Sequence, residues 1–197
     1  MGRKVRRIPV TLDTKGIKTL DSNEIKMILR AADNLIMSGG RTLLAKILKG
    51  SKEKKIFELE LEKNPAYAYF KDLNIEDIKA KIDWLIENWY LTIEYDYRLP
   101  LLVYTPKGWE IEKDTYSDEL LEGFDFMLNS GTDLYLMNYL KDRNREMIMM
   151  LLNKVEATNN PKYIPILKAW EKIDYKKVQK RIRNVVNHLE DNQNVLQ

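Results

Sequence analysis

The sequence predicts a mainly α-helical protein with a small β-hairpin, followed by a second group of helices. Three observations predict this fold class. Residues 24–88 hold three segments in which apolar side chains recur at helical spacing. Residues 91–96 alternate apolar and polar side chains, and a turn that contains Pro100 separates them from the mostly apolar residues 101–105, which is typical of two paired strands. Beyond residue 143, apolar side chains recur at helical spacing again.

The order of these elements, helix, turn, helix and hairpin, is that of a winged helix-turn-helix. A capping pattern at residues 21–24 opens the first helix, and the glycines at 39–40 are expected to end it. The second helix is expected from about Thr42 to Gly50. The third follows the capping residue Asn74 and runs over residues 75–88.

Two other segments are expected to be extended. Residues 8–12 are predicted to form a short strand. Phe57, Leu59 and Leu61 alternate with glutamates, which favours a strand or an extended segment. Residues 66–70, which follow a turn signal, are expected to pack under the hairpin.

Several spaced motifs also resemble a known family. They are Gly40-Arg41-Thr42, Ile47-Leu48-Lys49-Gly50-Ser51, Tyr90-Leu91 and Val103-Tyr104-Thr105-Pro106-Lys107-Gly108. In this order they resemble the RQC domain, the winged helix at the C-terminal side of RecQ-type DNA helicases, over residues 24–112. The whole chain is similar to small stand-alone bacterial proteins built on that domain. The resemblance implies a DNA-binding winged helix.

The distribution of charge is consistent with a surface that binds a polyanion. The net charge of the chain is only +3, but residues 1–55 carry 14 Lys and Arg against 5 Asp and Glu. Residues 56–97 are acidic and residues 143–197 are basic again. One basic face on an otherwise solvated protein would give this pattern, as would ordinary variation of charge along a soluble chain.

The candidate phosphate-binding residues lie at the edges of the predicted winged helix. Arg41 and Thr42 stand at a helix start, where free N–H groups and the helix dipole favour a phosphate. The turn after that helix offers hydroxyl and ammonium donors: Ser51, Lys52, Lys54 and Lys55. The resemblance to RQC domains implies phosphate binding at both places, whereas a plain solvated loop is the alternative for the lysine-rich turn. Lys107 is a further candidate.

The third helix is expected to contribute little to DNA binding. Its solvent side is predicted to present mostly acidic side chains, namely Glu76, Lys79, Asp83 and Glu87. Carboxylates repel backbone phosphates, so deep insertion of this helix into a DNA groove is not expected.

The hairpin supplies the remaining candidates. Residues 97–100 are predicted to be its turn, with Tyr97 and Arg98 at the tip. An aromatic ring and a guanidinium can stack on a base. The RQC resemblance implies that Tyr97 helps to part the end of a duplex, and the alternative is an ordinary exposed turn.

The chain divides into four predicted parts. A basic arm covers residues 1–23, the winged helix 24–113, an acidic connector 114–143 and an α-helical module 144–197. The winged helix should close with one helical turn that is capped by Thr105, and residues 129–132 are a loop signal. The last two helices flank Asp174 and resemble a single HEAT-type hairpin.

Catalytic functions are not expected. The chain has no cysteine and no phosphate-binding loop of the type that powers nucleotide-driven motors. The helicase core and zinc module that accompany RQC domains in RecQ enzymes are absent, and the one histidine, His188, is expected at the surface. We therefore expect no catalytic residues, no cofactor and no metal. A cytoplasmic protein without a membrane span fits the lack of cysteine and of long apolar runs.

The sequence thus predicts a non-catalytic DNA-binding protein that acts on backbone and duplex ends or junctions, in repair, recombination or replication. Two alternatives stay open. The chain could be a protein-interaction adaptor, with the C-terminal helices as a partner surface, or a dimeric winged-helix transcription regulator. No dimerisation heptads are evident in the sequence, which weakens the second alternative.

Overall fold

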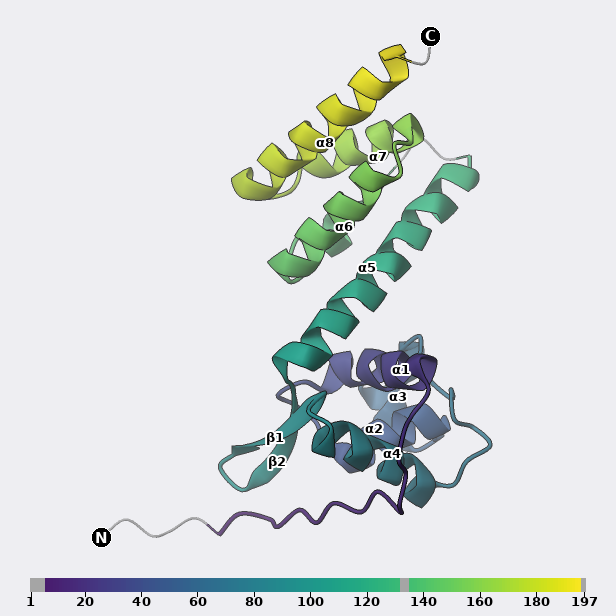
Figure 1. Cartoon of the computed structure of the whole chain (residues 1–197), viewed down its shortest axis with the longest axis vertical. Helices are drawn as coiled ribbons and strands as arrows, with labels where there is room; N and C mark the ends of the chain where they lie inside the picture. The colour runs from purple at the N-terminus through teal and green to yellow at the C-terminus, as the bar shows by residue number, and fades with distance from the viewer. Residues whose placement is uncertain (1–5, 132–134, 196–197) are drawn as a thin grey trace, which may run out of the picture. The chain divides into compact units, whose positions relative to one another are not determined.

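A computed structural model describes residues 6–131 and 135–195 of the chain (Figure 1). The chain forms two compact units, Met1–Glu112 and Lys113–Gln197. The boundary between them falls inside helix α5, Pro106–Asn129. In the described part of the chain, no helix combines the length and the apolar character that crossing a membrane requires.

The first unit is a winged helix. Its elements are α1 (Ser22–Ala32), α2 (Arg41–Lys49), the short α3 (Lys54–Glu58), α4 (Ile75–Glu87), β1 (Leu91–Asp96), β2 (Leu99–Tyr104) and the first turns of α5. The strands form an antiparallel hairpin in which Leu91 pairs with Tyr104 and Asp96 with Leu99. This arrangement confirms the predicted fold class, a mainly α-helical winged helix-turn-helix that is followed by further helices.

The structure confirms three of the predicted helix boundaries. The side chain of Asp21 accepts a hydrogen bond from the amide of Asn23 at 2.7 Å and caps α1. Asn74 caps α4 in the same way through the amide of Asp77 at 2.9 Å. Gly50 ends α2 with a φ of 74°, the left-handed conformation that favours glycine at this position.

The predicted end of the first helix was wrong. Helix α1 ends at Ala32, and a 3₁₀ turn (Asp33–Leu35) follows well before the glycines at 39–40. The next residues pair with the hairpin: the amide of Met37 donates to the carbonyl of Leu102 at 3.0 Å, and the amide of Leu102 donates to the carbonyl of Gly39 at 2.9 Å. These bonds replace those that a longer helix would have made.

Neither predicted extended segment is a strand. Residues 54–63 form α3 and a 3₁₀ turn (Leu61–Lys63), in which Ile56 and Leu61 are buried while Phe57 and Leu59 are about half exposed. Residues 66–70 bond to the end of α2, where the amide of Phe70 donates to the carbonyl of Leu48 at 2.8 Å. The apparent alternation therefore reflects tight helical turns.

Residues 8–12 are extended but form no strand. The amide of Ile8 donates to the carbonyl of Arg98, in the turn of the hairpin, at 3.1 Å. The next residue, Pro9, has no N–H group with which a ladder could continue. This part of the chain runs past the tip of the hairpin and does not add a strand to it (Figure 1).

One continuous core holds the first unit together. Fully buried aliphatic side chains from α1, α2, α4 and both strands pack in it, among them Ile28, Leu44, Ile82, Leu91 and Leu102. Burial of this kind supplies most of the stabilisation of a small domain. The hairpin is therefore fixed on the helices along its base, while its turn projects from them.

Helix α5 is much longer than the single turn that the sequence predicted. It starts as expected, with the hydroxyl of Thr105 accepting a hydrogen bond from the amide of Gly108 at 3.2 Å. A Cβ atom at Gly108 would lie 1.9 Å from the carbonyl oxygen of Tyr90, so only glycine allows α5 to start this close to the hairpin. The helix then continues to Asn129, so much of the predicted connector is helical.

In the described residues, the second unit contains the rest of α5, the helices α6 (Arg145–Ala157), α7 (Ile164–Glu171) and α8 (Lys176–Val195), and two 3₁₀ turns (Asn138–Leu140 and Pro161–Tyr163). Phe124, Trp170 and Ile182 are fully buried in it. Arg181 of α8 donates two hydrogen bonds to the carboxylate of Glu156 in α6, at 3.0 and 2.6 Å. The predicted loop at residues 129–132 begins with a turn at residues 130–131, and Thr132 lies outside the described residues.

The two units provide a direct test of modularity. We expect a chain that ends at Lys113 to fold cooperatively, because the core of the first unit draws only on residues before that point. Circular dichroism during thermal unfolding would measure this, with the full chain as reference. An insoluble or non-cooperative fragment would mean that the chain is a single domain.

Candidate nucleic-acid interface

A groove of about 450 Å³ lies beside the start of α2. One wall is the N-terminal segment at residues 8–10, and another is formed by residues 99–102 of β2. Between them lie the first residues of α2, together with the side chains of Lys46 and Lys55. The groove therefore joins four segments that are far apart in the sequence.

The start of α2 offers backbone donors to this groove. Its N-cap residue is Gly40, so no side chain caps the first turn. The carbonyl of Gly40 accepts from the amides of Leu43 and Leu44, and the amides before these two have no helical acceptor. Thr42 is exposed and lines the groove. An uncapped helix start with an exposed hydroxyl is suited to an anion.

Arg41 is anchored by a buried carboxylate. Its guanidinium bonds to Asp83 of α4, which is only 3% exposed, and the second carboxylate oxygen of Asp83 accepts from the amide of Asp13 at 2.9 Å. The prediction that Asp83 faces solvent was wrong, because these two partners draw it inward. Asp83 neutralises Arg41 and also fixes the guanidinium at the edge of the groove.

The lysine-rich segment is split between a turn and a helix. Ser51 and Lys52 precede α3, whereas Lys54 and Lys55 are its first residues. Lys54 forms an ion pair with Glu58 at 2.9 Å, and Lys55 is exposed and lines the groove. The structure thus brings Lys55 together with the start of α2 and leaves Lys54 partly neutralised.

Ser51 and Lys52 differ in what they offer to a ligand. The hydroxyl of Ser51 accepts from the amide of Glu53 at 3.3 Å, and its carbonyl accepts from the hydroxyl of Tyr67 at 3.0 Å. Lys52 is exposed, and in the described part of the chain its ammonium has no hydrogen-bond or ion-pair partner. Ser51 therefore shapes the turn, and Lys52 is the open cation on it.

The hairpin turn contains two residues, Tyr97 and Arg98. Leu99 and Pro100 belong to β2, so the four-residue turn predicted from the sequence was too long. Tyr97 has a φ of 52° and is 71% exposed. A tyrosine in this conformation at the end of an anchored hairpin presents its ring to solvent.

The N-terminal segment adds cations at the tip of the hairpin. The Nε of Arg98 donates to the carbonyl of Arg6 at 3.1 Å, and the hydroxyl of Tyr95 donates to the carbonyl of Ile8 at 2.9 Å. The guanidinium of Arg7 lies 4.9 Å from the centre of the Tyr95 ring. The sequence signalled this segment only as a basic run, because bonds to backbone carbonyls leave no residue pattern.

Lys107 does not belong to the groove. Its ammonium donates to the carbonyl of Asn88 at 3.1 Å and lies 3.7 Å from the centre of the Tyr90 ring. These contacts hold it at the end of α4, where a cation complements the helix dipole. Its interactions are those of a structural lysine.

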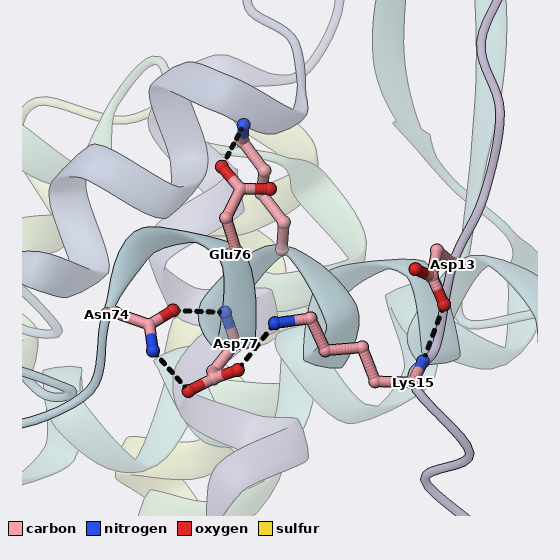
Figure 2. Close-up of polar contacts among 6 residues, drawn as sticks. Asp13, Lys15, Asn74, Glu76 and Asp77 are labelled. Carbon is pink, nitrogen blue, oxygen red and sulfur yellow. Dashed lines mark hydrogen bonds and ion pairs between the residues drawn. The ribbon is translucent and has the colours of Figure 1, made fainter.

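The N-terminal segment also crosses the start of α4 (Figure 2). The side chain of Asp13 accepts from the amide of Lys15 at 2.8 Å, and the ammonium of Lys15 pairs with Asp77 of α4 at 2.7 Å. The hydrogen bond from Lys15 is the main reason why the pKa of Asp77 lies below its ordinary value. Lys79 pairs with Glu76 on the same face at 2.9 Å.

A third contact lies further along this segment, where the indole of Trp84 donates to the carbonyl of Lys18 at 3.3 Å. Residues 6–18 are therefore attached at the hairpin tip, at Asp83, at Asp77 and at Trp84. We call this segment the strap. It occupies part of the outer face of the helix that would enter a DNA groove in a generic winged helix.

Comparison with known proteins gave one family match. The model of the RQC domain matches residues 18–119, which is slightly more than half of the chain. The matched range contains every helix and strand of the winged helix, whereas most of the strap lies before it. No curated protein and no solved structure matches the chain.

Proposed function

Since this chain belongs to the RQC-domain family, whose domain is a DNA-binding winged helix, we propose that it binds DNA by the phosphate backbone and prefers duplex ends or junctions. The observation that carries this proposal is the groove beside α2. It combines uncapped backbone amides, a hydroxyl, an anchored guanidinium and an open lysine in one concave place.

The chemistry of the groove favours phosphate over a base edge. Backbone amides at a helix start bind phosphate oxygens without reading sequence. Arg41 lies at the rim with its guanidinium held by Asp83, so little conformational freedom is lost when a phosphate binds beside it. Lys55, and Lys52 on the adjacent turn, add mobile positive charge. We propose these residues and Thr42 as the backbone contacts.

The strap gives a reason for binding without deep groove insertion. Helix α4 carries paired acidic side chains on its outer face, and the strap is bonded to that face. Inserting α4 into a major groove would require the strap to detach from α4. It would also bring the carboxylates of α4 near the phosphates, which repel them. Contact through the edges of the unit avoids both costs.

The tip of the hairpin is the proposed reader of DNA structure. Tyr97 offers an exposed ring, and Arg98 is its neighbour in the turn. The guanidinium of Arg7 lies over the ring of Tyr95 close to this turn, and Arg6 is bonded to Arg98 through its backbone carbonyl. A ring stacks most readily where a base face is already open, because unstacking an internal step costs a few kcal/mol. Duplex ends and junctions provide such faces.

A binding panel tests this function. Labelled closed circular duplex and blunt-ended duplex, forked, bubbled and single-stranded DNA of equal length would be titrated with the full chain at two salt concentrations. We expect tighter binding to forked or blunt-ended DNA than to closed circular duplex, and weaker binding to every form at the higher salt concentration. Absence of binding at low salt would favour the adaptor hypothesis instead.

Replacing Tyr97 by alanine should remove the preference for ends. The loss of stacking on an open base is expected to cost about 1–3 kcal/mol on forked DNA and little on continuous duplex. The salt dependence should stay the same, because the tyrosine ring carries no positive charge that could neutralise a phosphate. Fluorescence anisotropy on matched forked and circular substrates measures both quantities. Phe126→Ala, which truncates an exposed aromatic side chain that does not line the groove, serves as the control.

We further propose that the chain acts without catalysis, in the cytoplasm, in DNA repair, recombination or replication. Its chemistry supports passive binding, because the proposed contacts are hydrogen-bond donors, cations and a stacking ring. We also propose that the last two helices form a HEAT-like hairpin and that they provide a surface for a protein partner. Size-exclusion chromatography with light scattering would test the dimeric-regulator alternative.

A further inference from the structure

The second unit has a cavity of its own, of about 300 Å³. It lies between the turn that leads into α6 and the start of α8. Three exposed cations from a short stretch of the chain line it, namely Lys141, Arg143 and Arg145. This concentration of positive charge lies in a unit that the proposed function of the winged helix does not use.

Arg143 is held in position by neutral groups. Its Nε donates to the carbonyl of Tyr139 at 3.1 Å, and its guanidinium lies 5.1 Å from the centre of the Tyr116 ring. Neither contact neutralises the charge, and neither uses the terminal nitrogens. A guanidinium that is fixed by one nitrogen and a ring face keeps its two-pronged donor edge available for a phosphate.

The other two cations are more open. The ammonium of Lys141 lies 5.5 Å from the centre of the Tyr175 ring, and that ring is half exposed. Arg145 is the first residue of α6, and within residues 6–131 and 135–195 its side chain has no hydrogen-bond or ion-pair partner. Both side chains can therefore turn toward a ligand.

The carboxylates at the cavity do not cancel this charge. Asp174 is buried and accepts from the indole of Trp170 at 2.7 Å and from the amide of Tyr175 at 2.6 Å, so its oxygens are engaged. Asp142 is exposed and is the second acidic residue of the lining. Three cations against these two leave the lining positive.

The positive surface continues beyond the cavity. Lys176, Lys177 and Lys180 lie in the first turns of α8, and all three are exposed. Elsewhere in this unit, basic side chains on α6, α7 and α8 are paired: Lys154 with Asp118, Lys168 with Glu190, and Arg183 with Glu171. Six exposed cations therefore lie in the lining of the cavity or in the first turns of α8.

We propose that this surface is a second nucleic-acid site, which binds the phosphodiester backbone of a DNA or RNA strand. A single phosphate would need only the cavity, whereas the cations on α8 extend the surface as a chain of phosphates requires. The proposal goes beyond the function assigned to the winged helix and does not depend on it.

The test uses the full chain in four forms. They are the parent, Lys141→Gln with Arg145→Gln, the winged-helix variant Lys52→Gln with Lys55→Gln, and the combination of all four changes. Lys162→Gln with Lys168→Gln, two exposed lysines of the same unit that neither line the cavity nor belong to α8, is the matched control. Thermal unfolding checks that each variant is folded, and affinity for a labelled duplex and a labelled single strand is measured against salt.

The proposal predicts that Lys141→Gln with Arg145→Gln makes the logarithmic salt slope shallower by about 0.7–0.9 for each phosphate that is no longer neutralised. The combined variant should bind more weakly than either pair alone, and the matched control should bind as the parent does. Parent-like affinity of the cavity variant in both backgrounds would overturn the second site and leave the winged-helix proposal standing. If binding is lost in the cavity variant while the winged-helix variant binds as the parent does, the second site is supported and the winged-helix proposal is overturned.

Competition distinguishes the ligand class. Inorganic phosphate and an acidic peptide of similar charge are added to the complex of the winged-helix variant with labelled single strand. Competition only by unlabelled nucleic acid supports the proposal. Equal competition by the peptide, or displacement by phosphate at low concentration, would overturn the assignment to a nucleic-acid backbone.

Discussion

Replacing Asp83 by alanine is expected to lower the free energy of unfolding by about 2–4 kcal/mol. The carboxylate is buried, binds the guanidinium of Arg41 and accepts the amide of Asp13. Without it, Arg41 would keep a largely buried charge with no counterion, and the strap would lose one of its attachments. Equilibrium unfolding in denaturant measures the difference from the parent.

Asp77 provides the control for this prediction. It lies on the same helix and pairs with Lys15 of the strap, but both side chains of that pair are well exposed to solvent. Replacing Asp77 by alanine should leave the stability nearly unchanged, because exposed ion pairs are screened. Equal destabilisation by the two substitutions would mean that the burial of Asp83 is not what makes its pair important.

Reversing the charges of Lys52 and Lys55 should weaken duplex binding by roughly 10–100-fold at moderate salt. Each lysine to glutamate change removes a cation and adds a repulsive charge near the proposed path of the backbone. The effect should be the same for duplexes of different sequence, since phosphate contacts carry no base information. Titration of two unrelated duplexes measures affinity and sequence dependence together.

The matched control for this variant changes the same total charge elsewhere on the unit. Lys18 and Lys71 are both exposed and do not line the groove. Replacing both by glutamate should reduce affinity far less than the change at Lys52 and Lys55. Similar losses in the two double variants would show that net charge, and not the groove, governs binding.

Local signals in the sequence predicted much of the winged helix. The side chains of Asp21 and Asn74 each fix the start of a helix, and the backbone freedom of Gly50 fixes the end of another. The first strand followed from the alternation at residues 91–96, and the second from the apolar run after the turn. Such features need no partner from elsewhere in the chain, which is why they can be recognised before the fold is known.

Contacts between distant segments explain most of what was missed. Asp83 lies within a polar stripe of α4, but Arg41 and the amide of Asp13 bring it inward, and neither partner can be inferred from helical spacing. The position of the strap depends on bonds to backbone carbonyls, which any residue type can make. The groove exists only because these segments meet.

Helix α5 is a different case, because a signal was present. Tyr116, Leu120 and Phe124 recur every four residues and are all buried. The many acidic side chains between them suggested a connector, although they occupy the exposed face of a continuous helix. For the candidate site, the sequence pointed to segments that the structure places at the groove and at the hairpin tip. It could not distinguish the open Lys52 and Lys55 from Lys54 and Lys107, which have partners within the chain.

The salt dependence of duplex affinity tests the central claim most directly. If the groove and the hairpin tip hold backbone phosphates, the logarithm of the association constant should fall linearly with the logarithm of salt concentration. The slope should be about −0.9 for each phosphate that is neutralised, or roughly −3 if Lys52, Lys55 and one arginine of the tip each engage one. Undetectable binding at the lowest salt concentration, or an affinity that does not change with salt, would contradict the account.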